Sequence, residues 1–143
     1  MSRATLLLVL VLLGAYGQKS GKPQPPSGER QRPPGAIDCP RDRLTSYTGK
    51  VTSYSRGEDR LRIRIHTDWD TDEEFTLQFR KGEDPAGRFL FRSEAFRPDK
   101  WKAIESAKGR LRPGMRAAVW ECKAGGYPEL TIDWQPPSEQ EKN

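Results

Sequence analysis

The sequence predicts a small, mainly β protein with five short strands and one short helix. Three observations lead to this prediction. Apolar and polar residues alternate along Arg60–Arg80 on both sides of an acidic stretch, which is the pattern of two strands that bury one face. The same alternation returns in Leu130–Gln135, and one helix-like stretch lies between these regions. A length of 143 residues allows one domain rather than two.

Residues 1–17 have the parts of a secretory signal peptide. A positive charge at Arg3 precedes the apolar run Thr5–Leu13, and Ala15 and Gly17 are small residues at the positions that signal peptidase reads. The apolar run is shorter than the roughly 20 residues that a membrane-spanning helix needs. We therefore expect a secreted or periplasmic protein with a cleaved signal peptide and no membrane span.

Residues 18–38 are rich in proline, glycine, glutamine and basic residues and show no apolar period. This composition predicts a disordered linker. The linker either touches an anionic partner as a basic arm or spaces the domain from a surface, and the spacer is favoured. The folded domain is expected at 39–136, and residues 137–143 are expected to form a disordered tail.

The strands follow in order along the domain. The first is predicted over Leu44–Tyr54, where Gly49 indicates a bulge or a sharp bend. The hairpin Arg60–Arg80 supplies strands two and three, and Arg88–Phe91 can add a short extra strand. Strand four is expected over Met115–Cys122. Strand five is the alternating segment near the C-terminus, which two prolines end because proline cannot donate to a ladder.

A short helix is predicted over Pro98–Lys108. Pro98 fits the first helical position, since its missing N–H is not needed there, and Asp99 suits the positive end of the helix dipole. Gly109 fits a left-handed C-terminal cap. Trp101 begins a narrow apolar stripe, so the helix is expected to cap the core.

The two cysteines, Cys39 and Cys122, predict a disulfide. An even number of cysteines in an oxidising compartment favours pairing over two separate thiols. The closed loop is long, and the chain-entropy argument gives it a stabilising effect of about 4 kcal/mol.

The element order is three strands, one helix and two strands, and the first strand has a central glycine. Together with the run Leu111–Val119, which looks like the usual entry into a fourth strand, this order resembles the OB (oligonucleotide/oligosaccharide-binding) fold. The resemblance covers about Leu44–Gln135 and implies a small five-stranded barrel, with the helix as a cap between strands three and four. It also implies that strand one closes antiparallel on strand four, which would bring Cys39 near Cys122.

The resemblance implies a ligand face on strands two and three, flanked by the loops after strands one and four. The candidate ligand-binding residues are Arg60, Arg62, Arg64, His66, Trp69, Gln78, Arg80 and Tyr127. Arginines spaced by two project from one side of a strand and suit phosphate, sulfate or carboxylate groups. The alternative is a solvated face whose arginines pair with carboxylates of the neighbouring strand, such as Glu74.

The acidic stretch of the hairpin is a weak candidate for calcium. Asp68, Asp70 and Asp72 alternate as at the start of a calcium loop, but the glycine and the distal glutamate of an EF-hand are missing. A solvated hairpin tip is favoured. His66 is the single histidine, which excludes a histidine-rich metal site, and no nucleophile with a base is recognisable. We expect no cofactor and no enzyme activity.

The favoured function is a secreted, non-catalytic binding module that holds a protein or an anionic polymer on the face of strands two and three. A nucleic-acid partner is weakly supported, because the face lacks aromatic stacking platforms and the net charge of +5 is divided between linker and domain. The alternatives are a structural or accessory envelope domain without its own ligand and, less favoured, a calcium-dependent nuclease or phosphodiesterase.

Overall fold

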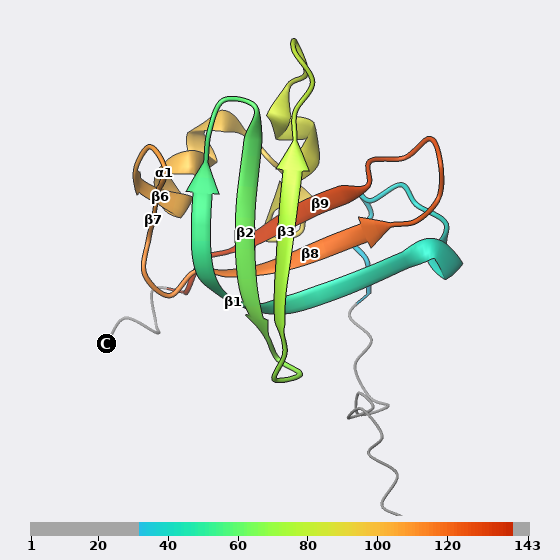
Figure 1. Cartoon of the computed structure of the whole chain (residues 1–143), viewed down its shortest axis with the longest axis horizontal. Coiled ribbons are helices and arrows are strands. Elements are labelled where there is room, and N and C mark those ends of the chain that lie inside the picture. Colours follow the sequence, from blue (N-terminus) through green and yellow to red (C-terminus); the bar gives the residue numbers. More distant parts are fainter. Residues whose placement is uncertain (1–31, 139–143) are drawn as a thin grey trace, which may run out of the picture.

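The computed structural model describes residues 32–138 (Figure 1). The predicted signal peptide, most of the predicted linker and the last part of the tail lie outside the described residues. Residues 32–38 of the predicted linker are described, and Pro34 is buried.

A seven-stranded sheet dominates the described chain. Its strands are β1 (Leu44–Arg56), β2 (Arg60–Thr67), β3 (Asp72–Gln78), β4 (Phe89–Phe91), β5 (Glu94–Ala95), β8 (Arg116–Cys122) and β9 (Leu130–Gln135). The order across the sheet is β3-β2-β1-β8-β9-β4-β5. Neighbouring strands are antiparallel, except that β4 runs parallel to β9. The remaining elements are η1 (Arg41–Arg43), η2 (Pro85–Arg88), η3 (Pro98–Lys100), α1 (Trp101–Ile104), β6 (Glu105–Ala107) and β7 (Arg110–Leu111).

The mainly β class with one short helix is confirmed, but the sheet has seven strands rather than the predicted five, and no closed barrel is found among the described residues. The reason lies between Gln78 and Phe89, where the chain leaves the sheet and forms η2. As a result β3 pairs only with β2, whereas β4 pairs with β9. The expected antiparallel pairing of strand one with strand four is present between β1 and β8.

The long strand β1 joins the two halves of the sheet. Its first part, from Leu44 to Lys50, pairs with β8, and its second part, from Gly49 to Arg56, pairs with β2. Figure 1 shows β1 bending between these two directions. A Cβ at Gly49 would overlap the carbonyl oxygen of His66, so this position accepts glycine alone. The predicted bend is confirmed, and a register shift follows between Val51 and Ser53.

The predicted alternation of the hairpin is confirmed. Leu61, Ile63 and Ile65 of β2 are fully buried, and the residues between them are exposed. Val119 of β8 and Trp134 of β9 belong to the same core cluster. The core therefore fills the space between the two halves of the bent sheet.

The helix ends earlier than the sequence predicts. The prediction of a helix over Pro98–Lys108 is wrong, because α1 ends at Ile104 and the following residues form the hairpin β6–β7. Gly109 has a φ of +78° in the turn of that hairpin, rather than at a helix cap. Trp101 of α1 packs edge-on against Phe89, with ring centroids 5.3 Å apart, and so covers the end of the core.

A buried polar network lies beside this helix. Glu105 is only 6% exposed. It accepts hydrogen bonds from Nε and Nη2 of Arg56, at 2.7 and 2.6 Å, and from the hydroxyl group of Tyr54. The Arg56 guanidinium also lies over the Trp101 ring, 4.1 Å from its centroid. Each polar group of this network therefore has a charged or aromatic partner.

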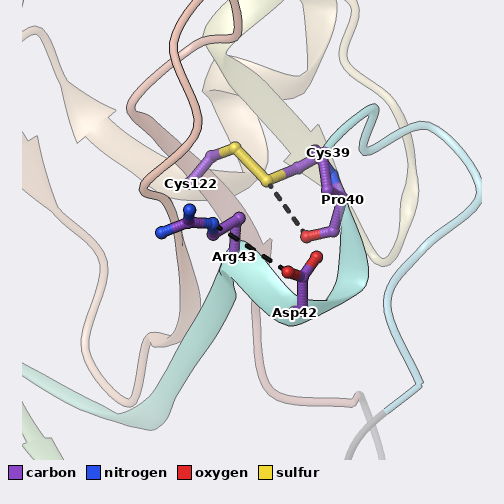
Figure 2. Close-up of a disulfide and its surroundings, with 5 residues drawn as sticks. All are labelled: Cys39, Pro40, Asp42, Arg43 and Cys122. Atoms are coloured by element: carbon purple, nitrogen blue, oxygen red, sulfur yellow. Dashed lines mark hydrogen bonds and ion pairs between the residues drawn. A yellow bond between two sulfur atoms is a disulfide. The ribbon is translucent and has the colours of Figure 1, made fainter.

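The predicted disulfide between Cys39 and Cys122 is confirmed, with an S–S distance of 1.99 Å (Figure 2). It joins the segment before η1 to the end of β8. The backbone N–H of Lys123 also donates to the carbonyl of Arg43, at 2.9 Å, so η1 and the loop after β8 are fixed to each other at two points.

Trp120 of β8 is buried, at 3% exposed, and lies outside the core cluster that contains Val119. Because side chains alternate along a strand, Trp120 occupies the opposite face of β8. Because Trp120 is buried there, this second face of β8 is also covered.

No helix within residues 32–138 has the length and apolar character needed to cross a membrane.

Candidate ligand-binding face and groove

Three arginines of β2, which we call the arginine row, project from the solvent side of the hairpin. The row consists of Arg60, Arg62 and Arg64, and each of these side chains is slightly more than half exposed. They share one face because every second residue of β2 points into the core. On β3, Gln78 lies opposite Arg60 and Thr76 lies opposite Arg62.

Carboxylates accompany the arginine row. Glu74 of β3 lies 2.9 Å from Arg64 and 3.8 Å from Arg62, and Asp59 lies 3.4 Å from Arg60. The pairing with Glu74 is the one that the sequence suggested as the alternative. Exposed pairs of this kind contribute about 0–1 kcal/mol each, so an anionic partner can compete with them.

The aspartates at the tip of the hairpin separate into two groups, one in contact with Arg116 and one in contact with His66. Asp68 forms a bidentate pair with Arg116, at 2.6 and 2.7 Å. Asp70 and Asp72 flank His66, at 3.3 Å from Nε2 and 3.0 Å from Nδ1. Within residues 32–138 no group of three or more His, Cys, Asp or Glu side chains is arranged to hold a metal ion. The three aspartates of the calcium candidate therefore do not converge on one point.

A groove opens at the other end of the hairpin, with a volume of about 820 Å³. It is lined by Thr76, Gln78, Arg80, Glu83, Arg88 and the loop 126–130. The groove brings together three residues that the sequence singled out separately, namely Gln78, Arg80 and Tyr127. Among residues 32–138, Tyr127 is one of two large hydrophobic residues that are exposed, at 37%. The other is Trp69, at 38%, which lies at the acidic tip and not in the groove.

Glu83 and Arg88 both line the groove and form an ion pair with each other. Glu83 accepts a hydrogen bond from the backbone N–H of Arg80, at 2.8 Å, and another from Nη1 of Arg88, at 3.4 Å. These bonds, the backbone bond first, lower the pKa of the Glu83 carboxyl below its usual value. Arg88 also donates from Nε to the carbonyl of Leu130, at 3.0 Å, and so ties η2 to β9.

Arg80 lies close enough to Glu83 for its charge to contribute to the lowered pKa of that carboxyl. Its side chain is exposed, and within residues 32–138 its guanidinium group has no ion pair or hydrogen bond. It lies in the groove beside Gln78 and Tyr127. An exposed guanidinium with free donors is available for a carboxylate, sulfate or phosphate.

Sequence reasoning missed Glu83 and Arg88 as parts of this site. Both lie in a stretch without periodicity or any recognisable motif, between the third strand and the predicted helix. Only the departure of the chain from the sheet after Gln78 brings them to the groove. The acidic residue before Pro85, which starts η2 by accepting a bond from the Ala86 N–H, was the one local signal available.

Comparison of this chain with protein-family models, with curated proteins and with solved structures found no match.

Proposed function

We propose that this protein is a secreted, non-catalytic binding module that holds a negatively charged partner on the outer face of β2 and β3 and in the adjoining groove. The observation that carries the proposal is the exposed guanidinium of Arg80 beside Gln78 and Tyr127, which has no ion pair or hydrogen bond within residues 32–138. Arg60 and Arg62 extend the same basic surface along β2, since they lie opposite Gln78 and Thr76.

The strand order supports the resemblance to OB domains. If β3 and β4 are taken as two parts of one interrupted strand, the order of pairing is that of the OB fold. This order has β1 between β2 and β8, and the last strand β9 parallel to the second part of strand three. In that fold the strand two–three face and the loop after strand four meet the ligand. Here these are the arginine row and the loop that carries Tyr127.

The disulfide supports a location outside the cytoplasm. A bond between Cys39 and Cys122 persists in oxidising compartments, and the segment at residues 1–17 has the composition of a signal peptide. Export to the periplasm or the medium agrees with both features.

A second candidate is an accessory domain without a ligand of its own. Glu74 favours it, because this carboxylate already neutralises part of the charge of Arg62 and Arg64. The two candidates differ in the expected behaviour of the arginines. In a binding module, removal of these arginines weakens partner binding. In an accessory domain, their removal changes the net charge but no binding affinity.

The experiment is a salt titration of binding to heparin, polyglutamate and duplex DNA. Replacing Arg60, Arg62 and Arg80 together by serine removes three contacts of about 0.2–1 kcal/mol each, so we expect affinity to fall about tenfold. The dependence of log affinity on log salt should flatten by about one unit for each lost DNA phosphate contact.

The matched control replaces Arg97, Lys102 and Arg110 by serine, which removes the same charge at exposed positions outside the groove and the face of β2. This control should retain the wild-type affinity apart from a small effect of net charge. Equal affinities of the two triple variants, or no binding to any of the three polymers, would remove the proposed face and favour the accessory domain.

A further inference from the structure

The strand β3 forms one edge of the sheet and pairs only with β2. The backbone bonds at its two ends fix which residues face β2. The N–H of Thr67 donates to the carbonyl of Thr71, at 2.7 Å, and the N–H of Phe79 donates to the carbonyl of Asp59, at 2.8 Å. In an antiparallel pair such bonds occur at every second residue. The odd-numbered residues of β3 therefore bond to β2, and the even-numbered residues direct their N–H and C=O groups away from it.

Two of these outward-directed residues, Thr76 and Gln78, line the groove. Their backbone donors and acceptors have no partner strand within residues 32–138. The groove thus has an unpaired strand edge as one wall. Such an edge offers alternating donors and acceptors with the spacing of a β-ladder.

The lining of the groove outside β3 is held in place by the contacts of Arg88 with Leu130 and Glu83. Tyr127 adds an exposed aromatic ring on this side, with Pro128 next to it. Tyr127 and Pro128 can make apolar contacts with a side chain of a bound ligand, whereas the strand edge can bind the main chain of a peptide. Arg80 stands at the end of the edge. Its charge acts on Glu83, but within residues 32–138 no carboxylate forms an ion pair or a hydrogen bond with its guanidinium.

These features select one kind of occupant. Sulfate groups and fully ionised phosphate groups only accept hydrogen bonds, so these groups by themselves leave the outward carbonyls of Thr76 and Gln78 without a donor. A peptide main chain supplies both donors and acceptors at the spacing of the edge, and this is the basis of strand addition. The free Arg80 complements a carboxylate in a bidentate pair.

A second copy of this chain fits the edge less well. The half of β3 outside the groove carries Asp72, Glu73 and Glu74 in a row. Charges of this kind on an edge strand discourage pairing between copies. Pairing is therefore confined to the two residues within the groove, which suits a single extended segment better than a whole sheet.

We propose that the groove binds an extended acidic peptide, which pairs with the free edge of β3 at Thr76 and Gln78 and places a carboxylate on Arg80. The proposal rests on the proposed function and narrows its partner from any anionic molecule to a polypeptide in extended conformation. Tyr127 contacts the peptide side chain that faces the loop.

The probe is a fluorescent heptapeptide of alternating valine and threonine with one central glutamate. It is compared with the same peptide methylated at every second backbone nitrogen, and with a version that carries glutamine in place of glutamate. Binding is followed by fluorescence anisotropy, and protection of the amide protons of Thr76 and Gln78 by hydrogen exchange. We expect the unmodified peptide to bind and to protect both amides, and the methylated peptide to bind about tenfold more weakly.

Two variants test the contacts from the protein side. Thr76→Pro removes the outward N–H from an edge position where proline is tolerated, and Thr76→Val keeps it as the control. The first should weaken peptide binding about tenfold, and the second should leave it unchanged. Arg80→Gln should weaken binding of the glutamate peptide to the level of the glutamine peptide. Thermal unfolding of each variant checks that the fold is retained.

The outcomes separate this proposal from the one on which it rests. Equal binding of the methylated and unmodified peptides, or no peptide binding up to millimolar concentration, overturns strand addition. Binding to heparin that depends on Arg60 and Arg62 would in that case still support the anionic face. A dimer that Thr76→Pro converts to a monomer would show a second copy on the edge and would also overturn the proposal.

Discussion

Glu105 is a buried carboxylate whose charge is supported by two side chains from β1. Burial opposes its ionisation, but the hydrogen bonds from Arg56 and Tyr54 and the charge of Arg56 outweigh this, so the pKa of Glu105 lies below its ordinary value of 4.5. The hydrogen bond between Tyr54 and Glu105 has the opposite effect on the pKa of Tyr54. Burial, together with the hydrogen bond to Glu105, raises the pKa of the Tyr54 hydroxyl, which therefore stays protonated and donates.

The Glu105→Gln variant should lose about 3 kcal/mol of stability at neutral pH, because the half-buried Arg56 then lacks its counterion. A lowered pKa in the folded state means that ionised Glu105 adds stability above the ordinary pKa of 4.5. This contribution is lost as pH falls through the lowered pKa. Urea unfolding from pH 7 to pH 3 should therefore show a difference between wild type and variant that is full above pH 4.5 and narrows below it.

Glu94→Gln is the matched control, since Glu94 is exposed on β5. It should unfold as the wild type does at neutral pH. A difference between wild type and Glu105→Gln that stays constant down to pH 3 would contradict the role given to the charge of Glu105.

Among the strands, β1 pairs with both halves of the sheet, and this double pairing depends on Gly49. Gly49 pairs with Thr67 of β2 and with Ala117 of β8 at the same position along the strand. The backbone of β2 comes so close there that even a methyl group would overlap the carbonyl of His66. The bend of β1 therefore requires a residue without a Cβ.

We expect Gly49→Ala to destabilise the protein by about 3 kcal/mol, because the added Cβ meets backbone atoms that cannot move aside without breaking the ladder. Thermal unfolding followed by circular dichroism measures this loss. Gly87→Ala serves as the control, since a Cβ there has no atom within 4 Å. Similar melting temperatures for the two variants would show that β1 and β2 separate more easily at Gly49 than the contact distances imply.

At the scale of the whole molecule, the disulfide connects residues 83 positions apart. Between them lie eight of the nine strands and the helix, so the bond encloses most of the described chain. It joins the start of the fold to the end of β8, and the loop that follows carries the Tyr127 wall of the groove. A bond that closes so long a loop acts mainly by restricting the unfolded chain.

Replacement of Cys39 and Cys122 by serine should lower the free energy of unfolding by about 4 kcal/mol, as the chain-entropy argument gives for a loop of this length. Urea unfolding in the absence of reductant measures the change. The wild type in excess reductant is the control and should unfold like the double variant. Equal stability of oxidised and reduced wild type would mean that the bond adds nothing to the fold.

Several local features of this protein can be predicted from its sequence. The alternation of Leu61, Ile63 and Ile65 with arginines settled which face of β2 is buried, because burial follows the period of the strand. The fifth predicted strand coincides with β9, since a loop and two prolines bound it. The two cysteines had only each other to pair with. These signals need no knowledge of distant residues.

Other features depend on contacts between residues far apart in the chain, and these features are visible only in the tertiary structure. Gly109 suits a left-handed backbone in a helix cap and in a hairpin turn alike, so its local sequence does not distinguish the two. In the structure Glu105 pairs with Leu111 across the hairpin and binds Arg56 of the distant strand β1. The chain leaves the sheet after Gln78 and returns as β4. The number of strands in the sheet and the parallel pairing of β4 with β9 both follow from this departure. The groove exists for the same reason, because an unpaired edge is a property of the assembled sheet and of no single segment.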